Sequence, residues 1–362
     1  DLSNRKFDGS FSIADPNLKM EFLGKIDFSD TLPVFDFTAD VDKAMLLPLN
    51  IVPTDPGYTL SCYLRANFIG ANLNDFDGEI TLVNSLFQKH DKQIQIYDFN
   101  FFAHHRPDTN QMILKSDLVN AEITGNYEFE DIGKASGILL AHHLPSFKNI
   151  VKAPLDQETS LNNFRFSFHF KNTFPITDFF FPDIEIARDS RISGLYHSAV
   201  HELSLTGDFP SLRWKNNRYE ELRLNLASDS TVAKLETTSS KLEAGSRINM
   251  ENLLFNARTY QDEFSYSISW DNHNQAQLYR GEVSGDAAFD FRKRNIFPRM
   301  DLNFNESEVV MDDTIWHLSQ SNVTIDTTHI SFQDFRFAHA SQALGIEGII
   351  STNPEDKLQF SF

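Results

Sequence analysis

The chain has 362 residues, of which 41% are hydrophobic, so it has enough apolar material for a core and is not a disordered polymer. Its 51 acidic residues outnumber the 32 basic ones, and the formal net charge of −19 repels phosphate backbones, which argues against a nucleic-acid partner. The single cysteine, Cys62, excludes an intrachain disulfide and a cysteine-based zinc site.

Apolar and polar residues alternate with a period of two along most of the chain, which predicts β-strands with one wet face. In the segment 163–171, for example, every second residue is a phenylalanine and the residues between are polar. Strands of this kind are typical of antiparallel sheets. In chain order, the clearest runs are Phe35, Phe37, Ala39 and Val41; Leu60, Cys62, Leu64, Ala66 and Phe68; Phe164, Phe166, Phe168 and Phe170; Leu222, Leu224 and Leu226; and Phe264, Tyr266, Ile268 and Trp270.

Helical patterns are scarce, and only two short segments match one. The first is predicted from about Asp42 to Leu49 and the second from about Ser146 to Val151, and prolines bound both. Helices this short are expected to act as lids or end-plugs of a sheet.

A weak internal repeat gives the chain a regular cadence. The sequence Phe7–Ile13 (FDGSFSI) returns as Phe76–Leu82 (FDGEITL), and an apolar-x-Gly step recurs six times, first at Phe22–Gly24. Glycine inside a strand indicates a bend or a close approach of two backbones. We therefore expect strands and bends to repeat over residues 1–143, a short helix and loop over 144–162, and the same repeats to continue over 163–362.

No familiar catalytic or metal-binding motif is present, so we predict a protein that is not an enzyme and has no catalytic residue, metal or cofactor. The only histidine clusters are the pairs His104–His105 and His142–His143. Neighbouring residues on a strand point to opposite faces, so we expect neither pair to chelate a metal ion.

Phenylalanine dominates the apolar pattern, with 34 residues against 3 Trp and 9 Tyr. An ordinary β-sandwich core is one explanation. The other is an open groove lined with phenylalanine and leucine. An exposed apolar surface of such length promotes aggregation, so it is expected only where it has a function.

No apolar run reaches the roughly 18 residues that span a bilayer, so any membrane anchor is expected outside this sequence. The alternation of Leu358, Phe360 and Phe362 at the end predicts a segment of a longer rod.

Four stretches resemble the TamB family of the AsmA-like superfamily. They are FDGSFSIADPNLKMEFL at Phe7–Leu23, FDFTADVDKAMLLPL at Phe35–Leu49, ISGLYHSAVHELSLTGDFPSLRW at Ile192–Trp214, and the segment Trp316–Phe360 with its cadence of IxGxIS followed by PxDxL. Each stretch is a degenerate repeat of apolar and turn residues, and their order carries the resemblance.

The resemblance implies an all-β fold in which an elongated, curled antiparallel sheet, a β-taco or repeating β-groove, has an apolar concave face. It implies a periplasmic bridge that carries phospholipid between the inner and outer membranes. The expected partners are phospholipid acyl chains, an Omp85/TamA-like outer-membrane barrel, and the inner membrane through an anchor outside this chain. The groove lining is then expected at Phe35, Phe37, Leu64, Phe68, Phe164, Phe166, Phe168, Phe170, Phe264, Tyr266, Ile268, Trp270, Leu358 and Phe360.

Two other functions compete with a lipid conduit. A scaffold that templates the strands of outer-membrane proteins would use exposed sheet edges to add a peptide strand. A β-solenoid that binds or cleaves polysaccharide would need carboxylates and exposed aromatic residues along one polar face. The rarity of Trp and the scattered acids disfavour the solenoid, whereas the sequence leaves the conduit and the scaffold both open.

Overall fold

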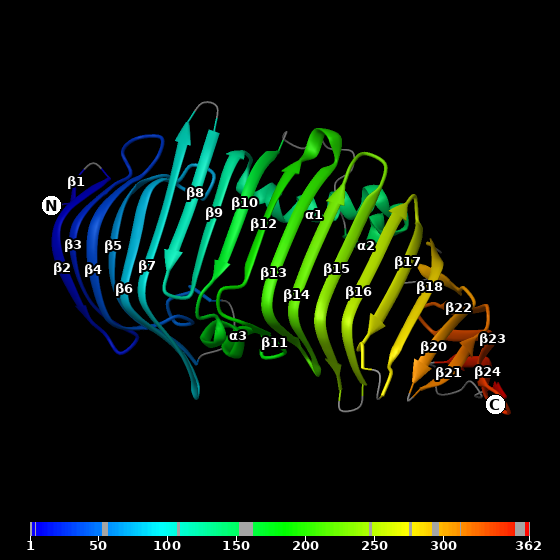
Figure 1. Ribbon diagram of the computed structural model, residues 1–362. Helices are drawn as coiled ribbons and strands as arrows, with labels where there is room; N and C mark the ends of the chain where they lie inside the picture. Colours follow the sequence, from blue (N-terminus) through cyan, green and yellow to red (C-terminus); the bar gives the residue numbers. More distant parts are fainter. Residues whose placement is uncertain are drawn as a thin grey trace. The chain divides into compact units, whose positions relative to one another are not determined.

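The computed structural model describes residues 2–3, 5–52, 57–106, 109–151, 162–245, 248–274, 277–291, 297–311, 313–351 and 359–361. The chain is all-β, with antiparallel strands and few short helices, which confirms the predicted fold class (Figure 1). It divides into two compact units. Unit 1 comprises residues 1–130, 162–194 and 212–215, and unit 2 comprises residues 131–161, 195–211 and 216–362.

Unit 1 is built on a meander in which each strand pairs with the next in antiparallel register, and Figure 1 shows β2 to β7 bending along their length. The strands of this meander are β1 (Leu2–Ser3), β2 (Lys6–Ala14), β3 (Leu18–Asp27), β4 (Val34–Met45), β5 (Tyr58–Ile69), β6 (Asp77–Lys89), β7 (Lys92–Arg106), β8 (Thr109–Ser116), β9 (Val119–Asn126) and β10 (Asn163–Phe170).

A short helix, α3 (Phe174–Phe180), follows β10 and is fixed to the meander by aromatic and charged contacts. The ring of Phe179 lies 5.3 Å from that of Phe87, and Lys92 forms an ion pair with Asp178 at 3.2 Å. After α3, β11 (Ile184–Ile186) pairs with the end of β13 (Glu202–Trp214). Strand β12 (Arg191–His197) and the 3₁₀ turn η2 (Ser198–Val200) lie between them in sequence.

Unit 2 continues the antiparallel pattern in a sheet whose strands pair in sequence from β14 to β19. These strands are β14 (Asn217–Ser228), β15 (Ala233–Ala244), β16 (Ile248–Tyr260), β17 (Glu263–Asp271), β18 (Arg280–Asp290) and β19 (Arg299–Phe304). The helix α1 (Phe129–His143), the turn η1 (Pro145–Phe147) and α2 (Lys148–Val151) also belong mainly to this unit.

The last part of unit 2 contains two interrupted strands. Strands β19 and β20 (Ser307–Met311) both pair with β18, while β21 (Thr314–Leu318) and β22 (Ser321–Ile325) both pair with β23 (His329–His339). Strand β24 (Gln342–Ser351) and β25 (Gln359–Ser361) complete the order. Each interruption keeps the direction of its strand, so the sheet retains its antiparallel pattern.

The helix predicted from Asp42 to Leu49 is wrong. Strand β4 continues to Met45, and Asp42 and Lys43 form a β-bulge between the pairs Val41–Cys62 and Ala44–Leu60. The bulge adds one residue, which breaks the period of two, so Val41 and Ala44 lie on the same face three residues apart, a spacing that resembles a helix. The helical segment predicted at 146–151 is confirmed as part of η1 and α2. Helices α1 and α3 were not predicted.

Candidate functional site

One face of the sheet in unit 1 is apolar from β2 to β10, and we call it the Phe face. Directly opposed residues of antiparallel strands lie on the same face, so the register defines its rows. One row runs Phe35, Phe68, Gly78, Ala103, Met112, Ile123, Phe166, and the next runs Phe37, Ala66, Ile80, Phe101, Leu114, Ala121, Phe168. Both rows mix large side chains with small ones, which are Gly78 and Ala103 in the first row and Ala66 and Ala121 in the second.

The rings of the Phe face form a continuous chain of contacts across β2 to β7. Their centroids lie 4.5–5.7 Å apart at each strand-to-strand step, the range in which aromatic pairs attract one another. The chain also includes a contact of 6.5 Å within β4. Its members are Phe7, Phe11, Phe22, Phe37, Phe35, Phe68, Phe76 and Phe101.

The predicted lining residues of unit 1 all lie on the Phe face. Phe35 stacks on Phe68 at 4.5 Å, and Leu64 lies between Ala39 and Leu82 in a third row. On β10, Phe164, Phe166, Phe168 and Phe170 follow one another at 6.1–6.4 Å. Phe164 is buried and the other three are half-buried, so part of their ring surface remains open to a ligand.

The predicted lining residues of unit 2 have a more varied setting. Phe264 and Tyr266 stack at 6.0 Å on β17, Ile268 faces Val283, and the ring of Trp270 lies over Gly281. Burial raises the pKa of the Tyr266 phenol to about 12, with Asp286 adding to the shift. Leu358 and the side chain of Phe360 lie outside the described residues.

Several members of the aromatic chain were not among the predicted lining residues. Phe22 is 5% exposed, and its alternation with Met20 in β3 was a signal that could have found it. Phe76 is equally buried and precedes β6, and the repeat FDGEITL that begins at Phe76 was a signal that could have found it. It contacts Phe68 at 4.6 Å and Phe101 at 5.2 Å, so a residue outside the strands links β5 to β7.

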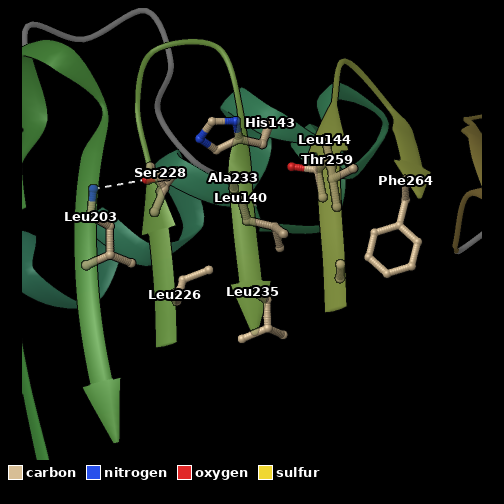
Figure 2. A pocket seen from close by; sticks show the side chains of 12 residues that line it. Leu140, His143, Leu144, Leu203, Leu226, Ser228, Ala233, Leu235, Thr259 and Phe264 are labelled. Atoms are coloured by element: carbon tan, nitrogen blue, oxygen red, sulfur yellow. Dashed lines mark hydrogen bonds between the residues drawn. The ribbon is translucent and has the colours of Figure 1, made fainter. Parts of the chain in front are cut away.

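Unit 2 contains an apolar cavity of about 330 Å³ between the end of α1 and the face of β13 to β17, which we call the α1 pocket (Figure 2). Two cross-strand rows form its floor. Ser228, Ala233, Thr259 and Phe264 form one row, and Leu226, Leu235 and Ala257 form the other. Leu139, Leu140, His143 and Leu144 come from the helix end, and Leu203 comes from β13. The volume is at the lower end of the range of small-molecule sites.

The helix end is fixed above this floor by contacts with two hairpins. His142 Nε2 contacts the Ser230 carbonyl at 2.8 Å. On the other side, the Ser146 N–H donates to Asp262 Oδ1 at 2.8 Å, and the rings of Phe147 and Phe289 lie 5.2 Å apart. These contacts tie the end of α1 and the segment after it to the sheet of unit 2.

Polar groups gather at one end of the α1 pocket. The Ser228 hydroxyl accepts the Leu203 N–H at 3.0 Å and donates to the His201 carbonyl at 3.2 Å, so its hydrogen bonds are satisfied. In contrast, Thr259 Oγ1 and both ring nitrogens of His143 are buried without a hydrogen-bond partner in the described part of the chain. Each such group costs about 1–3 kcal/mol when it is left unsatisfied.

The pair His142–His143 lies at the end of helix α1. The prediction that it lies on a strand is therefore wrong. The two rings approach at 5.1 Å, and His142 stacks on His201 at 3.8 Å. Burial, reinforced by neighbouring histidines, lowers the pKa of His143 and His201, whereas Asp229 acts in the opposite direction on His143. Within the described ranges, no group of three or more His, Cys, Asp or Glu side chains is arranged so that it could hold a metal ion.

His104 and His105 do lie on one strand, β7, and take different partners. His104 Nδ1 lies 2.9 Å from a carboxylate oxygen of Asp77, and His105 Nδ1 lies 3.0 Å from the amide oxygen of Asn110. In the segments that the structure covers, no helix combines the length and apolarity needed to cross a bilayer.

Comparison with known proteins gives no relative for this chain: no family model matches it, and neither a curated protein nor a solved structure does.

Proposed function

We propose that the chain is a segment of an envelope-spanning bridge that carries phospholipid between the inner and outer membranes along the Phe face, linked to outer-membrane protein assembly. The resemblance to the TamB family suggests this role, together with a periplasmic location, an inner-membrane anchor outside the chain and an Omp85/TamA-like partner barrel. The observation that carries the proposal is the continuous chain of phenylalanine rings across β2 to β7.

The energetics of this face suit acyl chains. A chain that leaves water gains about 0.8 kcal/mol for each buried methylene and needs no specific polar contact. Half-buried rings such as Phe35, Phe37 and Phe68 offer similar environments on successive strands, so no single position binds a chain much more strongly than the next. Similar affinity at neighbouring positions is what movement along the face requires.

The test compares lipid bound to purified protein by native extraction and mass spectrometry. Wild type is compared with Phe168→Arg, which places a charge on the Phe face, and with Ser167→Arg, which places the same charge on the exposed opposite face of β10. Phospholipid on wild type and Ser167→Arg, with loss from Phe168→Arg, is the expected result. A wild type free of phospholipid would overturn the proposal.

A second candidate is a scaffold that templates strands of outer-membrane proteins. It is favoured by the edge of β2, where Gly9–Ala14 pair with β3 on one side and have no strand on the other among the described residues. An extended peptide could add there by backbone hydrogen bonds. Protection of the amides of Gly9–Ala14 from hydrogen exchange by a peptide with an outer-membrane strand sequence would support this scaffold. Unchanged exchange would argue against it.

A further inference from the structure

The α1 pocket differs from the Phe face in two respects that bear on its ligand. It is a cavity of about 330 Å³ closed on one side by a helix end, whereas the Phe face is an extended surface. It also has a polar end. Figure 2 shows His143 and Thr259 at one end, with Thr259 Oγ1 turned towards His143, and Leu226 and Leu235 at the other end.

The apolar end fits an alkyl chain. Leu203, Leu226 and Leu235 point into the cavity from three successive strands, and Phe264 closes one side (Figure 2). A volume near the lower limit of ligand sites suits one alkyl chain better than the two chains of a phospholipid. The ligand class is therefore a single-chain amphiphile.

The polar end of the α1 pocket determines which polar group the amphiphile carries. His143 is 4% exposed, and its two ring nitrogens and Thr259 Oγ1 have no hydrogen-bond partner among the residues described. A neutral imidazole provides one donor and one acceptor, and a hydroxyl provides a donor. A carboxyl group can accept from the hydroxyl and from the ring N–H through its two oxygens, which a hydrocarbon cannot do.

We propose that the α1 pocket binds one unbranched fatty acid, with its carboxyl group at His143 and Thr259 and its alkyl chain over Leu226 and Leu235. Binding replaces the missing hydrogen bonds of the two side chains and buries the chain end beneath α1. No covalent step is involved. The site is separate from the Phe face, so it does not depend on phospholipid transport.

The experiment measures laurate binding to the delipidated full chain by isothermal titration calorimetry, below the micelle concentration. His143→Phe keeps an aromatic ring and removes both nitrogens, and Thr259→Val keeps the shape and removes the hydroxyl. Each variant is expected to bind laurate at least about tenfold more weakly, in line with the loss of a hydrogen bond to a charged group. Thr237→Val makes the same change on the same face outside the pocket, and it is expected to bind as wild type does.

The outcomes separate this site from the proposed phospholipid function. Phe168→Arg is expected to lose phospholipid and to keep its laurate affinity. Absence of laurate binding to wild type would overturn the fatty-acid site whatever happens to phospholipid. Equal affinity of wild type and Thr259→Val would also overturn it, and this variant remains decisive if His143→Phe does not fold.

Discussion

Gly78 lies directly opposite Phe68 in the pairing of β5 with β6, and their backbones are too close for a side chain on the glycine. A Cβ atom on Gly78 would lie 2.6 Å from Phe68 Cα, and Gly78 holds φ at +139°, a conformation that other residues rarely adopt. Gly24 stands in the same relation to Phe37. Gly24 and Gly78 therefore mark close backbone approach beside phenylalanines of the Phe face.

Replacement of Gly78 by alanine is predicted to destabilise the protein, because the substitution forces both a strained φ and a clash with the backbone of β5. The strain in φ alone is worth about 1–3 kcal/mol. The urea midpoint, followed by far-UV circular dichroism, is expected to fall. Gly345→Ala is the matched control, because nothing lies within 4 Å of a Cβ atom there. An equal effect of both variants would contradict the prediction.

Consecutive residues in β3 allow a direct test of which face holds unit 1 together. Phe22 is 5% exposed and touches three rings, whereas Leu23 is 63% exposed. Phe22→Ala is predicted to cost about 3–5 kcal/mol of unfolding free energy. Leu23→Ala is predicted to change it by no more than about 0.5 kcal/mol. Urea unfolding of both variants measures the difference, and similar losses would show that the Phe face is not the core of unit 1.

Burial lowers the pKa of His143 and His201, which predicts acid sensitivity of unit 2. As the pH falls below 6.5, the ordinary pKa of histidine, these two histidines bind protons in the unfolded chain more readily than in the folded one. Stability that is present above this pH is therefore lost as the pH falls. His142 disfavours protonation of both rings, while Asp229 favours it at His143, as does the nearby Thr231 backbone, which makes no hydrogen bond of standard geometry with the ring.

The acid effect is measured as the change in urea midpoint between about pH 7.5 and pH 5.5. The variant His143→Phe/His201→Asn is expected to reduce the loss on acidification. Asparagine suits position 201 because the backbone there has φ of 51°. His317→Asn, at a partly exposed histidine beside Glu308, is the control and is expected to keep the wild-type loss. The same loss in the double variant would rule out this origin.

The strands of the Phe face were predictable because alternation is a local pattern. The spacing of Phe164, Phe166, Phe168 and Phe170 shows that they share a face without any knowledge of the neighbouring strands. The α1 pocket was not predictable, because Leu226, Leu235 and Ala257 become neighbours only through the register of three strands. Helix α1 was not predicted because its segment Gly137–Ala141 (GILLA) is a short apolar run, which periodicity alone cannot assign to helix or strand.

Asp262 is predicted to hold the segment after α1 in place above unit 2. Its carboxylate accepts the Ser146 N–H at 2.8 Å, and its backbone has φ of 70°, which glycine and asparagine both tolerate. Asp262→Gly therefore removes the acceptor without straining the turn, and Asp262→Asn keeps an acceptor oxygen in the same place. Hydrogen exchange of the Ser146 amide is expected to become faster in Asp262→Gly and to stay near the wild-type rate in Asp262→Asn.

The same comparison tests whether this anchor shapes the α1 pocket. Because Ser146 lies just beyond Leu144, which lines the pocket, release of the anchor is expected to weaken laurate binding in Asp262→Gly more than in Asp262→Asn. Wild-type exchange at Ser146 in Asp262→Gly would mean that the Ser146 hydroxyl, which donates to the Phe289 carbonyl at 3.2 Å, and the Phe147–Phe289 contact hold the segment without Asp262.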